Sequence, residues 1–408
     1  MVGVRPDGNT PWGESWAVAW RALLASRVVV LVAGALAAGL LGLDPRHTGF
    51  DPAGITTPYG GLGDALLAPF ARWDTTWFVA IAHDGYGDGA REAFFPLYPL
   101  LLAVGGTVTG GETVLAGIAL STAFAAVALT VLHRLVALDY GLGVARGAVL
   151  ATAFMPMSFF LSAVYSESLF LMLSVGAVYA ARTDRWAWAG ILGGLSAATR
   201  SAGVVLLVPL VLLWWDARGP RRERDLLWLT LVPAGVAAYC LYLWASGGDP
   251  QAPFAAQDVW FREFAGPFLG AWDGFVAAWE GARQLLSGSR EPVFFAQAGG
   301  DPFVVARHNI ELFAWLVAAL AALALGLRRL PLAYLAYVVV ALALPLSYPV
   351  VPQPLMSLPR FLLVLFPLAI AVAAWASERR WRGPVLLTLS TIGLAVYSAI
   401  FATWHWVA

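Results

Sequence analysis

Acidic and basic side chains that stand among apolar residues are the groups in this sequence with the potential for chemistry. Asp74 follows Trp73, and a second polar pair, His83 and Asp84, comes shortly after. A carboxylate that is partly desolvated among aromatic rings has a raised proton affinity, which suits a general base. The alternative for Asp74 is an interfacial acid that water solvates or that Arg72 neutralises, and His83 and Asp84 could equally be solvated interface residues.

Three further charged residues interrupt or begin apolar stretches. Glu167 begins one stretch, Arg200 interrupts another, and Arg360 begins a third. Charges at membrane depth are costly and usually have a partner or a function, so Glu167 and Arg200 are predicted either to pair with each other or to contact a substrate. A guanidinium binds phosphate in bidentate fashion. Arg360 could bind a phosphate in this way, or its side chain could instead extend to the lipid headgroups.

The elements that must position these residues are membrane-spanning helices. The 408 residues are 60% hydrophobic and 12% charged, whereas soluble globular chains are about 45–50% apolar and about 25% charged. Apolar runs of about 20 residues recur along the chain, which is the length a helix needs to cross the hydrocarbon. Long, unalternating runs argue against a β-barrel. The predicted fold class is therefore an all-α polytopic membrane protein.

Eleven spans are predicted, at 17–41, 113–135, 146–163, 167–182, 186–200, 202–216, 225–246, 308–327, 330–347, 360–377 and 384–406. The segment 94–110 holds Pro96 and Pro99 and is expected to lie on the membrane surface, while 64–84 is expected to form one amphipathic helix in the interface. The chain is predicted to form two modules. The first, 1–246, contains the long loop 42–112, and the second, 247–408, contains the long loop 247–307.

The arginines orient these spans. One set of short loops carries Arg134, Arg146, Arg182, Arg185, Arg218, Arg221, Arg222, Arg224, Arg328, Arg329, Arg379, Arg380 and Arg382. These loops share one side if 94–110 does not cross, and the positive-inside rule places that side in the cytoplasm. The N-terminus is then inside, with the first helix kept as a permanent span. The two long loops, rich in Trp, Phe and Gly, are outside, where function is expected.

Other features restrict the class of function. Formal net charge is zero, so no nucleic-acid partner is implied. The single cysteine, Cys240, cannot form an internal disulfide, and no metal-ligand cluster is visible, so neither metal nor cofactor is predicted. All 25 basic residues are arginine, which, with abundant Ala and Gly, indicates a GC-rich bacterial genome. Gly190, Gly193 and Gly194 resemble small-residue helix packing.

Four blocks of sequence together resemble a known family. They read WDTTWFVAIAHDGY at 73–86, FFPLYP at 94–99, YSES at 165–168 and RSAG at 200–203. In this order they resemble the PIG-V mannosyltransferases, which belong to the GT-C superfamily of membrane glycosyltransferases, and the long first external loop is similar to the GT-C layout. Two departures are that Trp77 stands where the family often has His, and Ala202 stands where it has Asn.

The resemblance implies a mannosyltransferase with a donor sugar carried on polyprenyl phosphate. The acceptor would be an extracytoplasmic glycolipid, lipoglycan or GPI-like molecule, reached from the plasma membrane of a bacterium, and the anomeric carbon would invert. Because the leaving phosphate is a weak base, no general acid is required. Asp74 is then the expected general base, and Arg200 and Arg360 are expected to hold the donor phosphate.

The other residues expected to contact substrate lie in loops and at span ends. They are Trp73, His83, Asp84, Tyr86, Tyr165, Glu167, Gln257, Trp260 and Arg262. Loop aromatics such as Trp260 could stack on a sugar ring or act only as interfacial anchors.

Three other functions are compatible with a polytopic helical chain. A secondary transporter or flippase would place ionisable residues near the midplane, usually within a repeat, and no repeat is visible. A non-catalytic lipid-binding scaffold would not need a carboxylate and arginines converging on one pocket. A GT-C enzyme that moves another lipid-linked sugar would share the predicted site.

Overall fold

The computed structural model describes residues 11–87, 89–217, 223–291, 301–350 and 353–407, which are nearly all helical and contain no named β-strand. Arg218, Arg221 and Arg222 of the predicted basic loops lie outside these residues. The elements in chain order are α1 (Trp12–Leu41), α2 (His47–Phe50), α3 (Gly61–Leu67), η1 (Ala68–Phe70), α4 (Thr75–Asp84), η2 (Arg91–Ala93), α5 (Leu97–Val108), α6 (Thr113–Ala153), η3 (Ser158–Leu161), α7 (Glu167–Arg182), α8 (Trp186–Thr199), η4 (Ser201–Leu206), α9 (Leu207–Asp216), α10 (Glu223–Leu229), α11 (Leu231–Ala245), α12 (Ala252–Ala255), η5 (Ala256–Trp260), α13 (Leu269–Ser287), α14 (Pro302–Gly326), α15 (Leu332–Ser347), α16 (Leu358–Leu363), α17 (Phe366–Ser377) and α18 (Arg382–Ala402).

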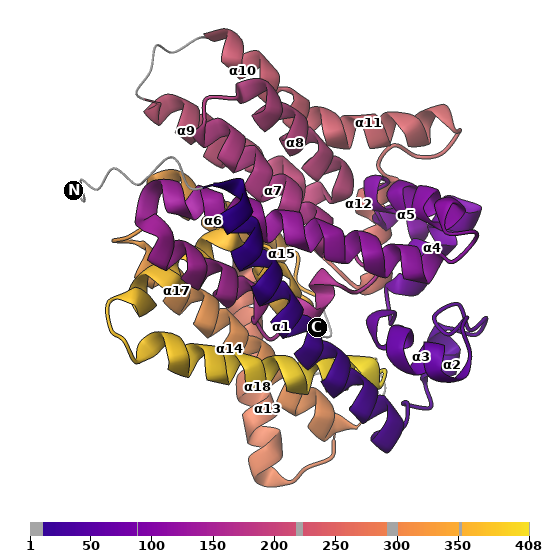
Figure 1. Cartoon of the computed structure of the whole chain (residues 1–408). Helices are drawn as coiled ribbons and strands as arrows, with labels where there is room; N and C mark the ends of the chain where they lie inside the picture. Colours follow the sequence, from indigo (N-terminus) through magenta and orange to yellow (C-terminus); the bar gives the residue numbers. More distant parts are fainter. Residues whose placement is uncertain (1–10, 88, 218–222, 292–300, 351–352, 408) are drawn as a thin grey trace.

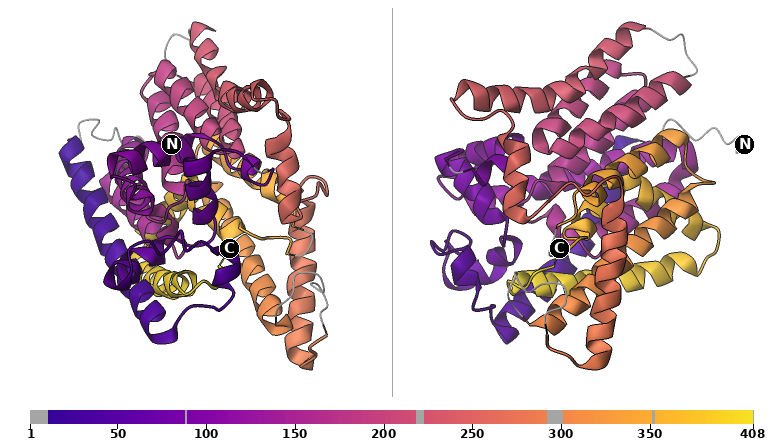
Figure 2. Two further views of the ribbon diagram at one scale, coloured as in Figure 1. Left: turned by 90° about the vertical axis from the view of Figure 1, so that its right-hand side faces the viewer. Right: turned by 180° about the vertical axis from the view of Figure 1, so that it is seen from behind.

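The long helix α6 lies at the centre of the bundle (Figure 1). It packs against α1, α7 and α17, while α8 lies between α7 and α11, and α18 packs along α1. The short helices α2 to α5 gather at one end of the bundle, on the right of Figure 1. Figure 2 shows α1 and the α13–α14 pair on opposite sides of the molecule. One large buried apolar cluster joins residues from both predicted modules.

The chain is an integral membrane protein. Among the described residues, five helices are long and apolar enough to cross a membrane: Trp12–Leu41, Thr113–Ala153, Glu223–Ala245, Pro302–Gly326 and Arg382–Ala402. Several other apolar helices are shorter, including α5, α15 and α17. The 12 residues of α5 reach only about 18 Å at 1.5 Å per residue. The count of eleven spans and the surface position of 94–110 remain predictions.

The predicted basic loops meet at one end of the bundle. Arg146 pairs with Glu14 at 3.1 Å, and Arg182 pairs with Asp139. The turn near 140 contacts the turn between α14 and α15, because the Tyr140 hydroxyl donates to the Arg329 carbonyl at 3.1 Å. Arg329 in turn pairs with Glu378 at 2.5 Å. These contacts connect four loops that the arginine pattern assigned to one side.

The predicted span 146–163 is wrong as a continuous helix. The helix α6 has non-helical dihedrals at Gly141 (φ 78°, ψ 171°), so the chain turns there, and the second part ends at Ala153. Residues 154–166 then form irregular turns and η3, and nearly all of them are buried. Irregular backbone is tolerated at membrane depth only where protein surrounds it, which the burial of this segment provides.

Three other boundaries differ from prediction. The single helix expected at 64–84 is divided into α3, η1 and α4, because Pro69 lies in the first turn of η1 and Trp73 adopts a left-handed backbone (φ 54°). The loop 247–307 contains the 19-residue helix α13. The span 360–377 is broken into α16 and α17 next to Pro367. Broken elements of this kind surround the cavity described below.

The glycines of α8 allow α10 and α11 to approach closely, as the small-residue pattern predicted. A Cβ on Gly190 would lie 2.0 Å from the Trp228 carbonyl oxygen, and a Cβ on Gly194 would lie 2.6 Å from the Leu231 carbonyl oxygen. Both contacts are with backbone, which cannot rotate away.

We therefore expect Gly190→Ala to destabilise the protein by about 1–3 kcal/mol, the usual cost of overpacking. The matched control is Gly39→Ala in α1, where a Cβ meets nothing within 4 Å and alanine's helix propensity is about 1 kcal/mol better. Thermal unfolding in detergent should show a lower midpoint for the first variant only. Equal midpoints would contradict the close packing.

Candidate active site

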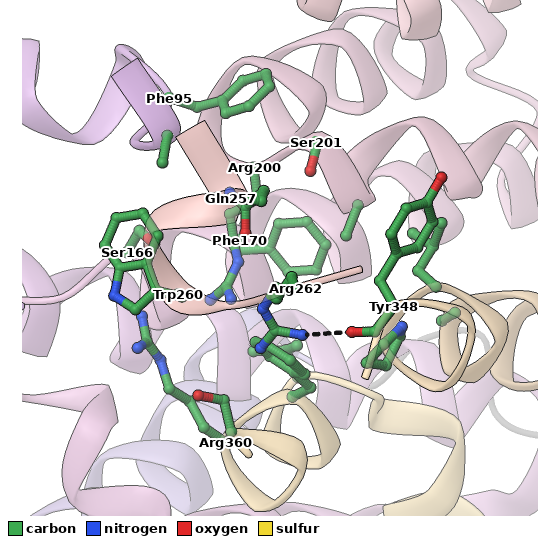
Figure 3. A pocket seen from close by; sticks show the side chains of 18 of the residues that line it. Phe95, Ser166, Phe170, Arg200, Ser201, Gln257, Trp260, Arg262, Tyr348 and Arg360 are labelled. Atoms are coloured by element: carbon green, nitrogen blue, oxygen red, sulfur yellow. Dashed lines mark hydrogen bonds between the residues drawn. The ribbon is translucent and has the colours of Figure 1, made fainter. Parts of the chain in front are cut away.

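One cavity of about 740 Å³ opens among the broken elements. Its polar side chains come from distant parts of the chain and include Asp74, Ser166, Arg200, Gln257, Asp258, Arg262, Glu263 and Arg360. Figure 3 shows the three arginines entering it from separate segments, with Trp260 and Gln257 beside them. Six of the residues predicted from sequence thus line a single cavity.

Asp74 owes its position to the break before α4. The left-handed backbone of Trp73 turns the chain, and Asp74 directly precedes the first residue of α4. Tyr165 holds this turn from the opposite side, because its hydroxyl accepts from the Asp74 N–H at 3.0 Å and donates to the Arg72 carbonyl at 3.0 Å. Arg72 is almost fully buried, and its Nε donates to the Ala402 carbonyl.

Arg360 connects two carboxylates. Its Nη1 donates to Asp74 Oδ2 at 2.5 Å, and its Nε donates to Glu167 Oε1. The guanidinium carbon lies 4.7 Å from the Tyr165 ring centre and 5.4 Å from that of Phe160. These two rings and Glu167 fix the guanidinium beside Asp74.

Arg200 completes the charged group, and the predicted pairing with Glu167 is present at 2.5 Å. Arg200 has an extended backbone at the junction of α8 and η4. Gly203 permits this junction, because a Cβ there would lie 2.3 Å from the Ala197 nitrogen. Ala202, which replaces the family's Asn, lines the cavity, so an amide at this position is absent from the site.

Arg262 differs from the other two arginines in its partners. Its Nη1 donates to the Tyr348 carbonyl oxygen at 3.1 Å, and its Nη2 donates to the Met356 carbonyl oxygen at 3.3 Å. The first of these bonds is drawn in Figure 3. Burial lowers the pKa of Arg262 to about 10, and the neighbouring Arg360 and Arg200 cations also lower this pKa. It remains charged at neutral pH, and an anion in the cavity would be attracted to it.

The irregular segment 154–166 presents Tyr165 and Ser166 to the site and leads into Glu167, the first residue of α7, and Arg27 of α1 holds this segment in place. The two terminal nitrogens of Arg27 donate to the Ser158 carbonyl, Ser158 Oγ, Ser162 Oγ and the Ala153 carbonyl at 2.6–3.5 Å. Arg27 therefore supplies hydrogen-bond partners to backbone carbonyls in a segment that is not a regular helix.

Six of the predicted substrate contacts do not line this cavity, and His83, Asp84 and Tyr86 have partners elsewhere. His83 Nε2 forms a hydrogen bond with Thr113 Oγ1 at 2.9 Å, Asp84 lies 3.7 Å from Arg91, and the Tyr86 hydroxyl donates to the Phe94 carbonyl. They lie at the far end of α4 and just beyond it. Trp73, Tyr165 and Glu167 are adjacent to the lining residues and hold them, as the preceding contacts show.

The cavity also has lining residues that the sequence did not predict. Many are aromatic, among them Phe254, Tyr348, Phe361 and Trp406, and two, Asp258 and Glu263, are acidic. Trp406 comes from the segment after α18 and packs edge-on against Trp73 at 5.0 Å between ring centres. No motif marked it, although the unusual density of Trp in 404–406 was a visible signal.

The arrangement joins the Asp74 carboxylate directly to the guanidinium of Arg360, while two further carboxylates, Asp258 and Glu263, line the cavity and are exposed. Asp74 is 19% exposed, Arg360 is 12% exposed and Glu167 is fully buried. Within the described ranges, no three His, Cys, Asp or Glu residues are grouped so that they could hold a metal ion. Such a site can accept a proton at Asp74 and bind an anion at the arginines.

Fold and site together define an integral membrane protein with a charged internal cavity. Residues 61–212 match the model of the family Mannosyltransferase (PIG-V). The family resemblance predicted from the motifs is confirmed for this segment, which carries Asp74, Glu167 and Arg200.

Two curated relatives are similar to about a third of the chain. The GPI alpha-1,6-mannosyltransferase 2 of Rattus norvegicus is 34% identical over 159 residues, covering 35% of this chain and 31% of the relative. That of Mus musculus is 34% identical over 158 residues, covering 36% and 32%. The match thus spans about a third of the length of these relatives.

Among solved structures, the Archaeoglobus fulgidus oligosaccharyltransferase complexed with Zn and sulfate is 12% identical, with a TM-score of 0.43 over 92% of this chain and 53% of that chain. The same archaeal enzyme with an inhibitory peptide and a dolichol-phosphate is 13% identical, with a TM-score of 0.40 over 93% and 56%.

Proposed function

We propose that this protein is a membrane glycosyltransferase that moves mannose from polyprenyl-phosphate mannose to an extracytoplasmic glycolipid, lipoglycan or GPI-like acceptor. The observation that carries the proposal is the convergence of Asp74 with Arg200, Arg262 and Arg360 on one cavity. The match of residues 61–212 to the mannosyltransferase family supports it. No cofactor or metal is part of the proposed reaction.

The proposed reaction needs one base and one anion site. The acceptor hydroxyl oxygen attacks the anomeric carbon, its proton passes to Asp74, and the bond from that carbon to the phosphate oxygen breaks. The electron pair of the broken bond leaves with the phosphate, which the arginines stabilise. Attack opposite the leaving group inverts the anomeric carbon. The cavity contributes by holding both substrates in line.

Proton transfer to Asp74 changes the charge of the cavity in the direction that the leaving group needs. The three guanidiniums are opposed by four carboxylates, because Asp258 and Glu263 line the cavity together with Asp74, and Glu167 pairs with Arg200 and Arg360 (3 − 4 = −1). After transfer Asp74 is protonated, so the sum rises to zero (3 − 3 = 0). This rise accompanies the release of a phosphate monoester that carries about −1.5 to −2 charges near pH 7.

The cavity also offers an apolar surface for a lipid chain. On one side it is lined by Tyr337, Ala341 and Leu344 of α15, and Val204 of η4 also contributes to its wall. An isoprenoid chain that lies against these residues would keep its phosphate near the arginines. The apolar lining therefore suits a donor that stays in the lipid phase better than it suits a water-soluble sugar nucleotide.

The proposed site of action is the outer side of a bacterial plasma membrane. The contacts among Arg146, Arg182 and Arg329 gather basic loops at one end of the bundle, and the positive-inside rule assigns that end to the cytoplasm. The first external loop supplies Asp74 to the cavity, so the reaction would occur outside. A cysteine-accessibility map of the loops would test this orientation.

The direct test is transfer of labelled mannose in membranes that contain the protein. Polyprenyl-phosphate mannose should support transfer, and the product should be an α-mannoside that α-mannosidase releases. GDP-mannose alone, in membranes without polyprenyl-phosphate mannose synthase, should not. Transfer directly from GDP-mannose would refute the lipid donor, and transfer only of another lipid-linked sugar would refute mannose. Substrate movement without transfer would favour a transporter.

For Arg262→Gln we expect the KM for the donor to rise by about 10- to 100-fold, because a hydrogen bond to a charged group contributes about 1.5–3 kcal/mol. The KM for the acceptor should change little. The matched control is Arg283→Gln on α13, whose partner is the neighbouring Glu280 at 2.9 Å and which does not line the cavity. A donor KM unchanged by Arg262→Gln would remove this residue from the phosphate site.

A further inference from the structure

The contact between Arg360 and Asp74 raises a question about the order of events. Asp74 Oδ2 accepts from Arg360 Nη1 at 2.5 Å. If Asp74 took a proton while this contact persists, the linked group of Asp74, Glu167, Arg200 and Arg360 would keep two guanidiniums opposed by one carboxylate, Glu167. An uncompensated cation is costly in a partly buried site. The contact with Arg360 therefore opposes proton transfer to Asp74.

A donor phosphate would remove this obstacle without moving Arg360. The guanidinium binds Glu167 through Nε and Asp74 through Nη1, so the two contacts are made by different nitrogens. The rings of Tyr165 and Phe160 fix its plane. A phosphate oxygen could replace Asp74 Oδ2 at Nη1 while the Nε contact with Glu167 persists. Only one bond would be exchanged.

We propose that Arg360 controls when Asp74 can act as a base, a role that we call a latch. The donor phosphate replaces the Asp74 carboxylate at Nη1 of Arg360, and only then does Asp74 accept the proton of the acceptor hydroxyl. This inference rests on the function proposed above. It implies that the donor binds before the acceptor is activated, and that an acceptor hydroxyl that arrives before the donor meets a carboxylate still paired with a cation.

The latch makes an unusual prediction about binding. Phosphate and Asp74 compete for the same guanidinium nitrogen, so removing the Asp74 charge should strengthen phosphate binding while it abolishes transfer. With a short polyprenyl monophosphate as probe, we expect Asp74→Asn to bind about tenfold more tightly than wild type, which corresponds to about 1.4 kcal/mol. Equilibrium binding to the full chain in detergent would measure this.

Simple repulsion between Asp74 and phosphate would also raise affinity, and a double-mutant cycle separates the two causes. If the gain arises through Arg360, Asp74→Asn should bring little gain in an Arg360→Gln background. If repulsion alone acts, the gain should persist there undiminished, which would overturn the latch. Should Arg360→Gln fail to fold, Arg360→Lys serves, because an ammonium on a flexible stem lacks the fork that joins both carboxylates.

Glu280→Gln is the matched control. Glu280 also pairs with an arginine, at 2.9 Å, but it lies on α13 and does not line the cavity, so its loss should leave binding unchanged. Weaker or equal binding by Asp74→Asn would refute the latch alone, provided that wild type binds the probe. Failure of wild type to bind any polyprenyl monophosphate would refute the proposed donor, and the latch with it.

Discussion

Asp74→Asn is expected to lower the rate of mannose transfer by about 10²- to 10⁴-fold, which is the usual contribution of a positioned general base. Asparagine preserves the size of the side chain and an oxygen that can accept from Arg360, so the fold should survive. The loss should appear in kcat, because the proton is transferred during the chemical step. Labelled transfer from polyprenyl-phosphate mannose, with both substrates saturating, measures it.

Two variants make the result specific to Asp74. Glu280→Gln removes an equally charged carboxylate outside the cavity and should leave kcat unchanged. Tyr165→Phe removes the hydroxyl that accepts from the Asp74 N–H and donates to the Arg72 carbonyl, and should give a smaller loss, because the base is displaced but present. Full transfer by Asp74→Asn would sink the assignment of Asp74 as base.

The second large effect concerns stability. Glu167 is fully buried and accepts from both Arg200 and Arg360. Glu167→Ala would leave two cations in the interior without this partner, and breaking a buried ion pair by removing one member typically costs about 3–5 kcal/mol. We therefore expect a large fall in the yield of monodisperse protein and in its thermal unfolding midpoint in detergent. Glu167→Gln, which retains an acceptor oxygen, should be less affected.

Glu378 provides a matched control at the surface. It also pairs with two arginines, Arg329 at 2.5 Å and Arg382 at 3.0 Å, but it is 46% exposed. Exposed pairs are screened by water and contribute little, so Glu378→Ala should scarcely change the midpoint. Equal effects of the two substitutions would contradict the view that burial makes Glu167 essential.

Local sequence was a good guide to which residues form the site, because each stands out against an apolar background. Asp74, Glu167 and Arg200 are conspicuous as charges among hydrophobic residues, and the pairing of Glu167 with Arg200 followed from the cost of burying either alone. Arg360 was noticed at the start of a predicted span. Its contact with Asp74, 286 positions away in the chain, is a product of tertiary packing that hydropathy does not encode.

The errors have a common physical origin. Hydropathy measures whether a segment prefers an apolar environment, and it is silent on whether lipid or protein supplies that environment. Residues 154–163 are as apolar as a span, yet they are irregular and surrounded by other helices. Likewise, the break at Trp73 depends on a left-handed backbone, which no periodicity in 64–84 revealed. The amphipathic helix α13 was missed because its charged residues resemble those of a loop.

The bonds that Arg27 makes to residues 153–162 also bear on how the chain is assembled in the membrane. The part of α6 after Gly141 ends at Ala153, and the following segment lacks the regular hydrogen bonds that let a helix enter lipid unaided. This stretch must therefore enter the bilayer together with α1, which supplies the four donated bonds. Loss of Arg27 would then act during biogenesis, as a failure of insertion and quality control, before any sugar is bound.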